Sequence, residues 1–113
     1  MSFDLERLLV DVDGDLERLR GPALEFVSQI PVCMIEVRKR VEEERLESLA
    51  SWCRSLASTF SALLAVPASE AAQALQIAAE RADPDRVVAC ACRLEGEVQV
   101  LLTDVAHVFQ IVV

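Results

Sequence analysis

The spacing of apolar residues in the last segment of the chain, Val87–Val112, constrains the fold most strongly. On a helical wheel, every residue within about 60° of one line along this segment is apolar, whereas Arg93, Glu97 and Asp104 lie on the other side. Such a stripe predicts an amphipathic helix that buries one face. The members of the stripe are Val87, Cys90, Ala91, Leu94, Val98, Leu101, Leu102, Val105, Val108, Phe109 and Val112.

A β-hairpin is the alternative for the same segment. Residues 88–94 and 97–102 contain several β-branched side chains, and Gly96 would occupy the turn between them. The alternation of apolar and polar residues that a half-buried strand needs fails at Leu101 and Leu102. The helix is therefore favoured, and a hairpin here would change the fold class to α+β.

The middle of the chain has no glycine or proline between Val32 and Val66. Apolar residues recur at helical spacing up to Val41 and again from Leu46 to Leu63. The step from Val41 to Leu46 breaks this spacing, so either a helix of about 35 residues changes its buried face there or a turn interrupts it. We expect the continuous helix, because the charged stretch between the two stripes holds pairs of opposite charge four residues apart.

Two shorter helices are expected before and after this central one. Residues 3–20 have the spacing of an amphipathic helix, which Gly21 and Pro22 would end, and Pro31 would kink the following helix or begin a new one. Ser69 would cap an alanine-rich helix over residues 70–82, whose small side chains would let a neighbouring helix approach closely.

The last helix has a clear start signal. Asp83 is followed by Pro84, which is the order expected for a cap and the first helical position.

Composition agrees with an all-helical protein. The chain is 53% hydrophobic but only 4% aromatic, and it has three glycines and four prolines, too few for the turns of a sandwich or barrel. Its 113 residues fit one domain. The sequence therefore predicts a single all-α domain over residues 1–113, a bundle of four or five helices with a long central helix.

Charge limits the classes of partner. The net charge of −8 disfavours nucleic acid and anionic membranes and favours a basic protein surface. An acidic N-terminus and the lack of an 18-residue apolar run predict a cytoplasmic, non-membrane protein. Lys39 is the only lysine among 11 basic residues, a bias expected of a bacterial protein with a GC-rich genome.

Residues 8–16, LLVDVDGDL, resemble the first motif of haloacid dehalogenase-type phosphatases. The resemblance implies a nucleophile at Asp11 and an acid/base at Asp13, although Asp15 replaces the threonine of the motif. That family also needs a Rossmann-like core, and the sequence has no alternation of strands and helices to supply one. A phosphatase is therefore not expected.

Two further sets of residues have the character of metal ligands. Asp104 and His107 are three residues apart, the spacing by which helical bundles present a carboxylate and an imidazole to a metal, and a metal- or ligand-binding bundle is the alternative function. A di-metal bundle needs that motif twice, and His107 is the only histidine. Cys90 and Cys92 lack the spacing of a zinc site, so we expect structural cysteines and no cofactor.

No catalytic set emerges from these residues, and we expect a non-catalytic protein–protein interaction module, such as an adaptor, small structural subunit, inhibitor or chaperone-like partner. The continuous apolar stripes predict that the chain meets itself or a larger protein, with a homodimer expected. The residues expected at the interface are Leu46, Leu49, Trp52, Leu56, Phe60 and Leu63 of the central stripe and Leu94, Val98, Leu101, Val105, Val108, Phe109 and Val112 of the last one.

Overall fold

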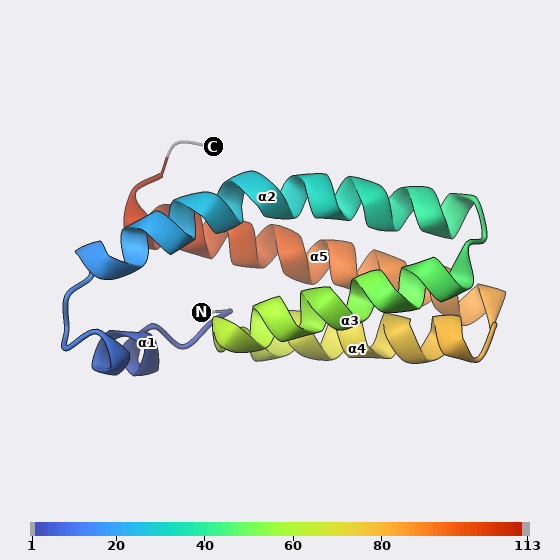
Figure 1. Cartoon of the computed structure of the whole chain (residues 1–113), viewed down its shortest axis with the longest axis horizontal. Coiled ribbons are helices and arrows are strands. Elements are labelled where there is room, and N and C mark those ends of the chain that lie inside the picture. The colour runs from blue at the N-terminus through green and yellow to red at the C-terminus, as the bar shows by residue number, and fades with distance from the viewer. Residues whose placement is uncertain (1, 112–113) are drawn as a thin grey trace.

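The computed structural model describes residues 2–111, and over these residues the chain forms five helices and no strand (Figure 1). The predicted all-α bundle is confirmed, and the hairpin alternative for the C-terminal segment is not supported. The helices are α1 (Leu5–Asp11), α2 (Glu17–Glu42), α3 (Leu46–Ala62), α4 (Val66–Glu80) and α5 (Pro84–Phe109).

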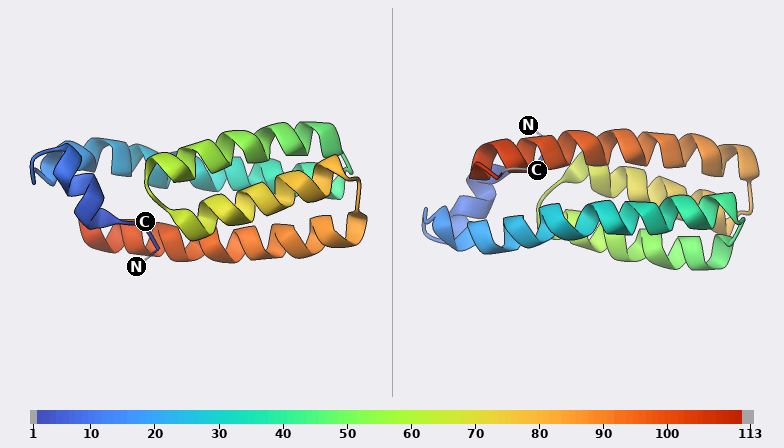
Figure 2. Two further views of the ribbon diagram at one scale, coloured as in Figure 1. Left: turned by 90° about the horizontal axis from the view of Figure 1, so that it is seen from below. Right: turned by 90° about the horizontal axis from the view of Figure 1, so that it is seen from above.

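Four of the helices form an up-and-down bundle in which each helix packs beside the next one along the chain and α5 returns to the side of α2 (Figure 2). The bundle measures 44 × 24 × 19 Å. With 26 residues each, α2 and α5 are longer than α3 and α4, which have 17 and 15. They therefore extend beyond the shorter pair at one end of the bundle, where α1 lies (Figure 1).

The prediction of one continuous central helix is wrong, because the chain reverses direction between Glu42 and Leu46. Glu44 adopts a left-handed conformation with φ 55°, and the Arg45 amide donates a hydrogen bond of 3.0 Å to the Arg40 carbonyl, which closes the end of α2. The break in apolar spacing between Val41 and Leu46 is thus a turn. Each stripe faces the core from its own helix.

The N-terminal region also differs from the prediction. The expected helix over residues 3–20 ends at Asp11, and the chain turns through Asp13 and Gly14, whose φ angles are 54° and 79°. Leu5–Asp11 is helical and not a strand, so the nine residues that resemble a phosphatase motif have a different local structure here. Glycine is the residue that adopts this left-handed turn at no steric cost.

Helix α2 then passes through all three residues that were expected to end or kink it. Gly21, Pro22 and Pro31 lie inside a helix that runs without interruption from Glu17 to Glu42. Both prolines are exposed, so water can solvate the backbone carbonyl groups that lose a hydrogen bond to each ring.

The alanine-rich helix α4 lies between α3 and α5 and packs closely on both. Ala71, Leu75, Ala78 and Ala79 are buried, in agreement with the small-residue face expected from the sequence, and Ala72 is fully buried beside them. Its start is earlier than expected, so Ser69 is no cap: it is buried within α4, and its hydroxyl donates a hydrogen bond of 3.2 Å to the Ala57 carbonyl of α3. Helix α5 begins as predicted, with the Asp83 carboxylate accepting a bond from the Arg86 amide.

Within residues 2–111, none of these helices combines the length and the apolar character that spanning a bilayer requires.

Candidate protein-binding groove

Most of the predicted interface residues lie in the core of the single chain. The buried ones face neighbouring helices of the same chain and are 4% exposed or less. They are Leu49, Leu56, Phe60, Leu94, Val98, Leu101, Val105 and Phe109. Of these, Leu56 alone also lines the surface groove between α2 and α3, and the side chains of the other seven are covered by the chain itself.

The other predicted interface residues are only partly covered. Leu46, Trp52, Leu63 and Val108 are half-buried, and Val112 lies outside the described residues. Two of them, Trp52 and Leu63, line the same surface groove. The interface stays a prediction. Among its half-buried residues, Trp52 and Leu63 are the ones that a partner bound in this groove would contact.

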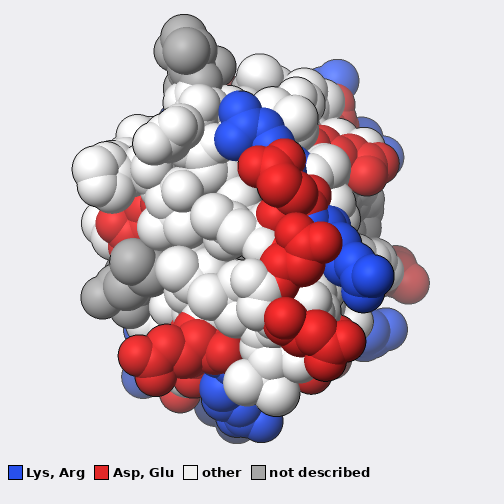
Figure 3. Space-filling model, turned by 90° about the vertical axis from the view of Figure 1, so that its left-hand side faces the viewer, with Lys and Arg blue, Asp and Glu red and all other residues white. Residues whose placement is uncertain are grey.

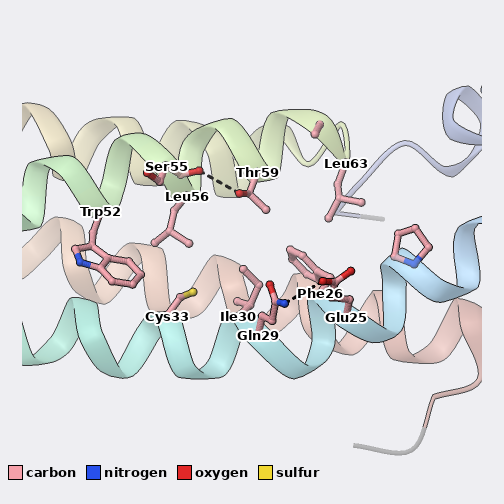
Figure 4. Close-up of a pocket in the computed structure, with 12 residues that line it drawn as sticks. Glu25, Phe26, Gln29, Ile30, Cys33, Trp52, Ser55, Leu56, Thr59 and Leu63 are labelled. Atoms are coloured by element: carbon pink, nitrogen blue, oxygen red, sulfur yellow. Dashed lines mark hydrogen bonds between the residues drawn. The ribbon is translucent and has the colours of Figure 1, made fainter.

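The groove lies between α2 and α3, the two neighbouring helices of the bundle with the sparsest contact (Figure 4). It has a volume of about 390 Å³. Buried side chains of Phe26, Ile30 and Leu56 form its floor, and the exposed Ser55 and Thr59 lie at its rim. An apolar floor with a few hydroxyls at the edge is the usual lining of a binding site.

Helical spacing places these side chains on facing sides of the two helices. On α2 the lining residues recur every three or four positions from Pro22 to Cys33, and on α3 they recur from Trp52 to Leu63. Of all the residues that line the groove, Glu25 alone carries a charge. The groove is therefore an apolar trough along about three helical turns.

Trp52 borders one end of the groove and is held there by Arg40. The Arg40 guanidinium carbon lies 4.9 Å from the centre of the indole ring, a cation–π contact. The Nε of Arg40 donates to the Ser48 hydroxyl at 2.6 Å, and its Nη1 donates to the carboxylate and the backbone carbonyl of Glu36. This hydrogen bond from Arg40 lowers the pKa of Glu36. The indole thus has a fixed position beside Cys33 (Figure 4).

The other end of the groove, at Pro22 and Leu63, lies near α1, in a part of the molecule that is rich in acidic side chains. Residues 4–17, which hold α1 and the turn into α2, contain six acidic side chains and one arginine, Arg7, and Asp15 among them pairs with Arg18 at 3.6 Å. Figure 3 views the molecule from this end, and acidic side chains there border a broad uncharged surface. A positively charged group is therefore attracted to this end of the groove.

The four cysteines are free thiols in different surroundings. Cys53 is fully buried, and burial raises its pKa to about 12. Cys33 lines the groove and is half-buried, with its pKa raised mainly by burial, whereas Cys92 is exposed. Because the thiolate is the reactive form, we expect Cys33 to react more slowly with alkylating reagents than an exposed thiol, and more slowly still when the groove is filled.

Asp104 and His107, the residues of the alternative metal-binding hypothesis, lie on α5, and the Asp104 carboxylate is already hydrogen-bonded. The Ser2 amide and hydroxyl donate hydrogen bonds of 2.8 and 2.7 Å to the same Asp104 carboxylate oxygen. They tie the N-terminal segment to α5 and lower the pKa of Asp104. Over the described part of the chain, no group of three or more His, Cys, Asp or Glu side chains is arranged to hold a metal ion.

The Asp104 contact predicts a pH-dependent contribution to stability. A carboxyl group whose pKa is lower in the folded chain stabilises the fold above its unfolded pKa, about 3.9, and the contribution disappears as the pH falls through the folded pKa. We expect Asp104→Asn to lower the free energy of unfolding at pH 7 by about 1 kcal/mol or less, since the group is largely solvated. Urea denaturation of both proteins should show this difference shrinking as the pH falls below the unfolded pKa. A difference that grows on acidification would contradict this assignment.

The sequence identified the α3 side of the groove but missed the α2 side. Trp52, Leu56 and Leu63 were expected at an interface, whereas Phe26 and Ile30 were not. The available signal was the step between Val41 and Leu46, since a turn there folds α2 back onto α3.

The chain matches no known family model, no curated protein and no solved structure, so its function has to be argued from the groove itself.

Proposed function

We propose that this chain is a non-catalytic protein-binding module whose groove between α2 and α3 receives an amphipathic helix of a partner protein. The observation that supports the proposal is the groove itself: an apolar floor of Phe26, Ile30 and Leu56, open to solvent, with Glu25 as its only charged residue. Laying the apolar face of a helix into such a groove is a common mode of peptide recognition.

The shape of the groove favours a helix as its occupant. It is bounded by two antiparallel helices, and its lining on α3 extends from Trp52 to Leu63, about 16 Å along the helix axis. A third helix laid between them would bring two or three apolar side chains, one per turn, onto the floor. Rim hydroxyls such as Thr59 would remain at the polar edge of the contact.

Charge favours a basic partner. The chain carries a net charge of −8, and one end of the groove opens beside the acidic residues 4–17. Lysine or arginine side chains on the polar face of the partner helix would be attracted to this end, and the attraction would raise the rate of association at low salt. The proposed partner is therefore an amphipathic helix with leucine-like anchors on one face and basic residues on the other.

A titration with designed peptides tests this proposal, with the fluorescence of Trp52, the only tryptophan, as the signal. The probe is a 14-residue helical peptide, about four turns long, with leucines on one face and lysines on the other. We expect saturable binding to the protein and a shift in Trp52 emission. A peptide with glutamate in place of each lysine, and one with the same composition in scrambled order, should bind at least about tenfold more weakly.

Two matched variants on α3 locate the binding site. Thr59 lines the groove and Ser58 does not, and both are exposed. Thr59→Arg places a long charged side chain in the groove and should weaken binding by about tenfold or more, whereas Ser58→Arg should leave it unchanged. Equal effects of the two substitutions, or binding that is indifferent to the apolar pattern of the peptide, would refute the proposal.

A further inference from the structure

The outer face of α2, which points away from the bundle and from the groove, carries apolar side chains in solvent. Val32 and Ile35 are 61% and 63% exposed, and Leu24 is 44% exposed. Pro31 lies beside them and is also exposed. Helical spacing brings these four residues onto one side of α2, together with Ser28. We call this set the outer α2 face.

From its charge pattern, we propose that the outer α2 face binds the same face of a second copy of this chain, with the two α2 helices antiparallel. The two-fold axis would pass between Pro31 and Val32. Such an interface is isologous, so each contact occurs twice. This inference goes beyond the proposed function and rests on a different surface.

The residue pattern is self-complementary about that axis. In an antiparallel pair of α2 helices with the axis between Pro31 and Val32, two residues lie opposite one another when their residue numbers add up to 63. Ser28 then meets Ile35, and Leu24 lies against the aliphatic part of Lys39. In this arrangement Val32 of each copy lies opposite Pro31 of the other, next to the axis. The apolar centre of one face is therefore covered by the apolar centre of the other.

Charge supports the same arrangement. Glu25 and Lys39 lie on the same side of the outer face, near its two ends, so in the antiparallel pair Glu25 of each copy lies close to Lys39 of the other. In a parallel pair Glu25 of one copy would lie about 21 Å along the helix from Lys39 of the other, so these ion pairs would not form. Lys39 is exposed and makes no ion pair among residues 2–111, whereas its neighbour Arg38 is held 3.0 Å from Glu95 of α5.

A dimer formed through the outer α2 faces leaves the floor of the groove open to a partner. The floor of the groove is formed by the side of α2 that faces α3, with Phe26, Ile30 and Cys33, whereas the outer face is formed by Leu24, Ile35 and their neighbours. Glu25 lies between the two surfaces and belongs to the edge of both. A dimer can therefore form whether or not the groove binds a helix. Because one helix face is a small interface, we expect a weak dimer with a dissociation constant on the order of 100 μM.

Analytical ultracentrifugation of the full chain, from about 10 μM to about 1 mM, tests this inference. We expect the fraction of dimer to rise over this range and Ile35→Glu to weaken association by about tenfold or more. Val100→Glu is the matched control, because Val100 is also an exposed β-branched apolar residue, at 52%, but lies on α5. It should leave the association unchanged.

A charge swap distinguishes this arrangement from any other dimer. Glu25→Lys alone and Lys39→Glu alone should each weaken association, because each places like charges opposite one another. The double variant E25K/K39E restores opposite charges and should recover most of the original affinity. A protein that remains monomeric at 1 mM would overturn the inference, and so would a dimer that Ile35→Glu does not weaken or that the double variant does not restore.

Discussion

Replacing Phe60 with alanine is expected to lower the free energy of unfolding by about 3–5 kcal/mol, far more than a substitution on the surface of the bundle should. Phe60 is fully buried in α3, and its ring meets the ring of Phe26 on α2 edge to face, with centroids 6.2 Å apart. Truncation removes this contact and leaves a cavity at the place where α2 and α3 are joined.

Urea denaturation followed by circular dichroism measures the loss. Since domains of this size are stable by about 5–15 kcal/mol, the variant should be near the limit of folding. Val100→Ala is the control: Val100 is 52% exposed, and its truncation should change the free energy of unfolding by about 0.5 kcal/mol or less. A Phe60→Ala loss as small as that of the control would show that α2 does not pack on α3 as described.

Replacing Ala72 with leucine is expected to be destabilising for the opposite reason. Ala72 is fully buried in α4, which packs closely on both α3 and α5. A larger side chain at this position has no space and would force the helices apart, at a cost of about 1–3 kcal/mol.

The neighbouring position supplies the control for this prediction. Gln73 is exposed on the same helix, so Gln73→Leu adds the same side chain without any buried contact and should change the stability by about 0.5 kcal/mol or less. Thermal unfolding of the two variants and the parent measures the difference. If Ala72→Leu is neutral or stabilising, then the close packing of α4 is wrong.

The C-terminal helix could be predicted because its apolar stripe continues over seven turns and Asp83-Pro84 marks its start. Alanine spacing likewise predicted the close packing of α4. Both are local signals. A pattern repeated every three or four residues identifies the buried face of a helix whatever lies opposite it.

The turn between α2 and α3 was harder to predict, because the residues that form it are not typical turn residues. The turn between α2 and α3 places Glu44 in the left-handed region, where glycine or asparagine is usual. Conversely, Gly21-Pro22 is a typical boundary, yet α2 continues through it. Tertiary packing of Ala23 and Phe26 on the core outweighs the local preference of the two residues before them.

Only the α3 side of the groove could be predicted from the sequence, because the groove exists only where two helices pack against each other. The stripe from Leu46 to Leu63 already contained the α3 residues, but whether they were buried or exposed depended on where the chain turned. Once the turn lies between Glu42 and Leu46, α2 runs antiparallel to α3, and Trp52 lies beside Cys33 on the facing helix. No periodicity within one helix contains that information.

The rate at which Cys33 is alkylated, with and without the basic amphipathic peptide, tests the proposed groove most directly. Cys33 lies in the groove, and the exposed Cys92 on α5 serves as an internal reference in the same sample. Mass spectrometry of the iodoacetamide-treated protein follows both thiols. We predict that saturating peptide slows the modification of Cys33 by about tenfold or more while Cys92 reacts at its original rate. Full binding of the peptide with no protection of Cys33 would place the helix elsewhere and contradict the groove as the binding site.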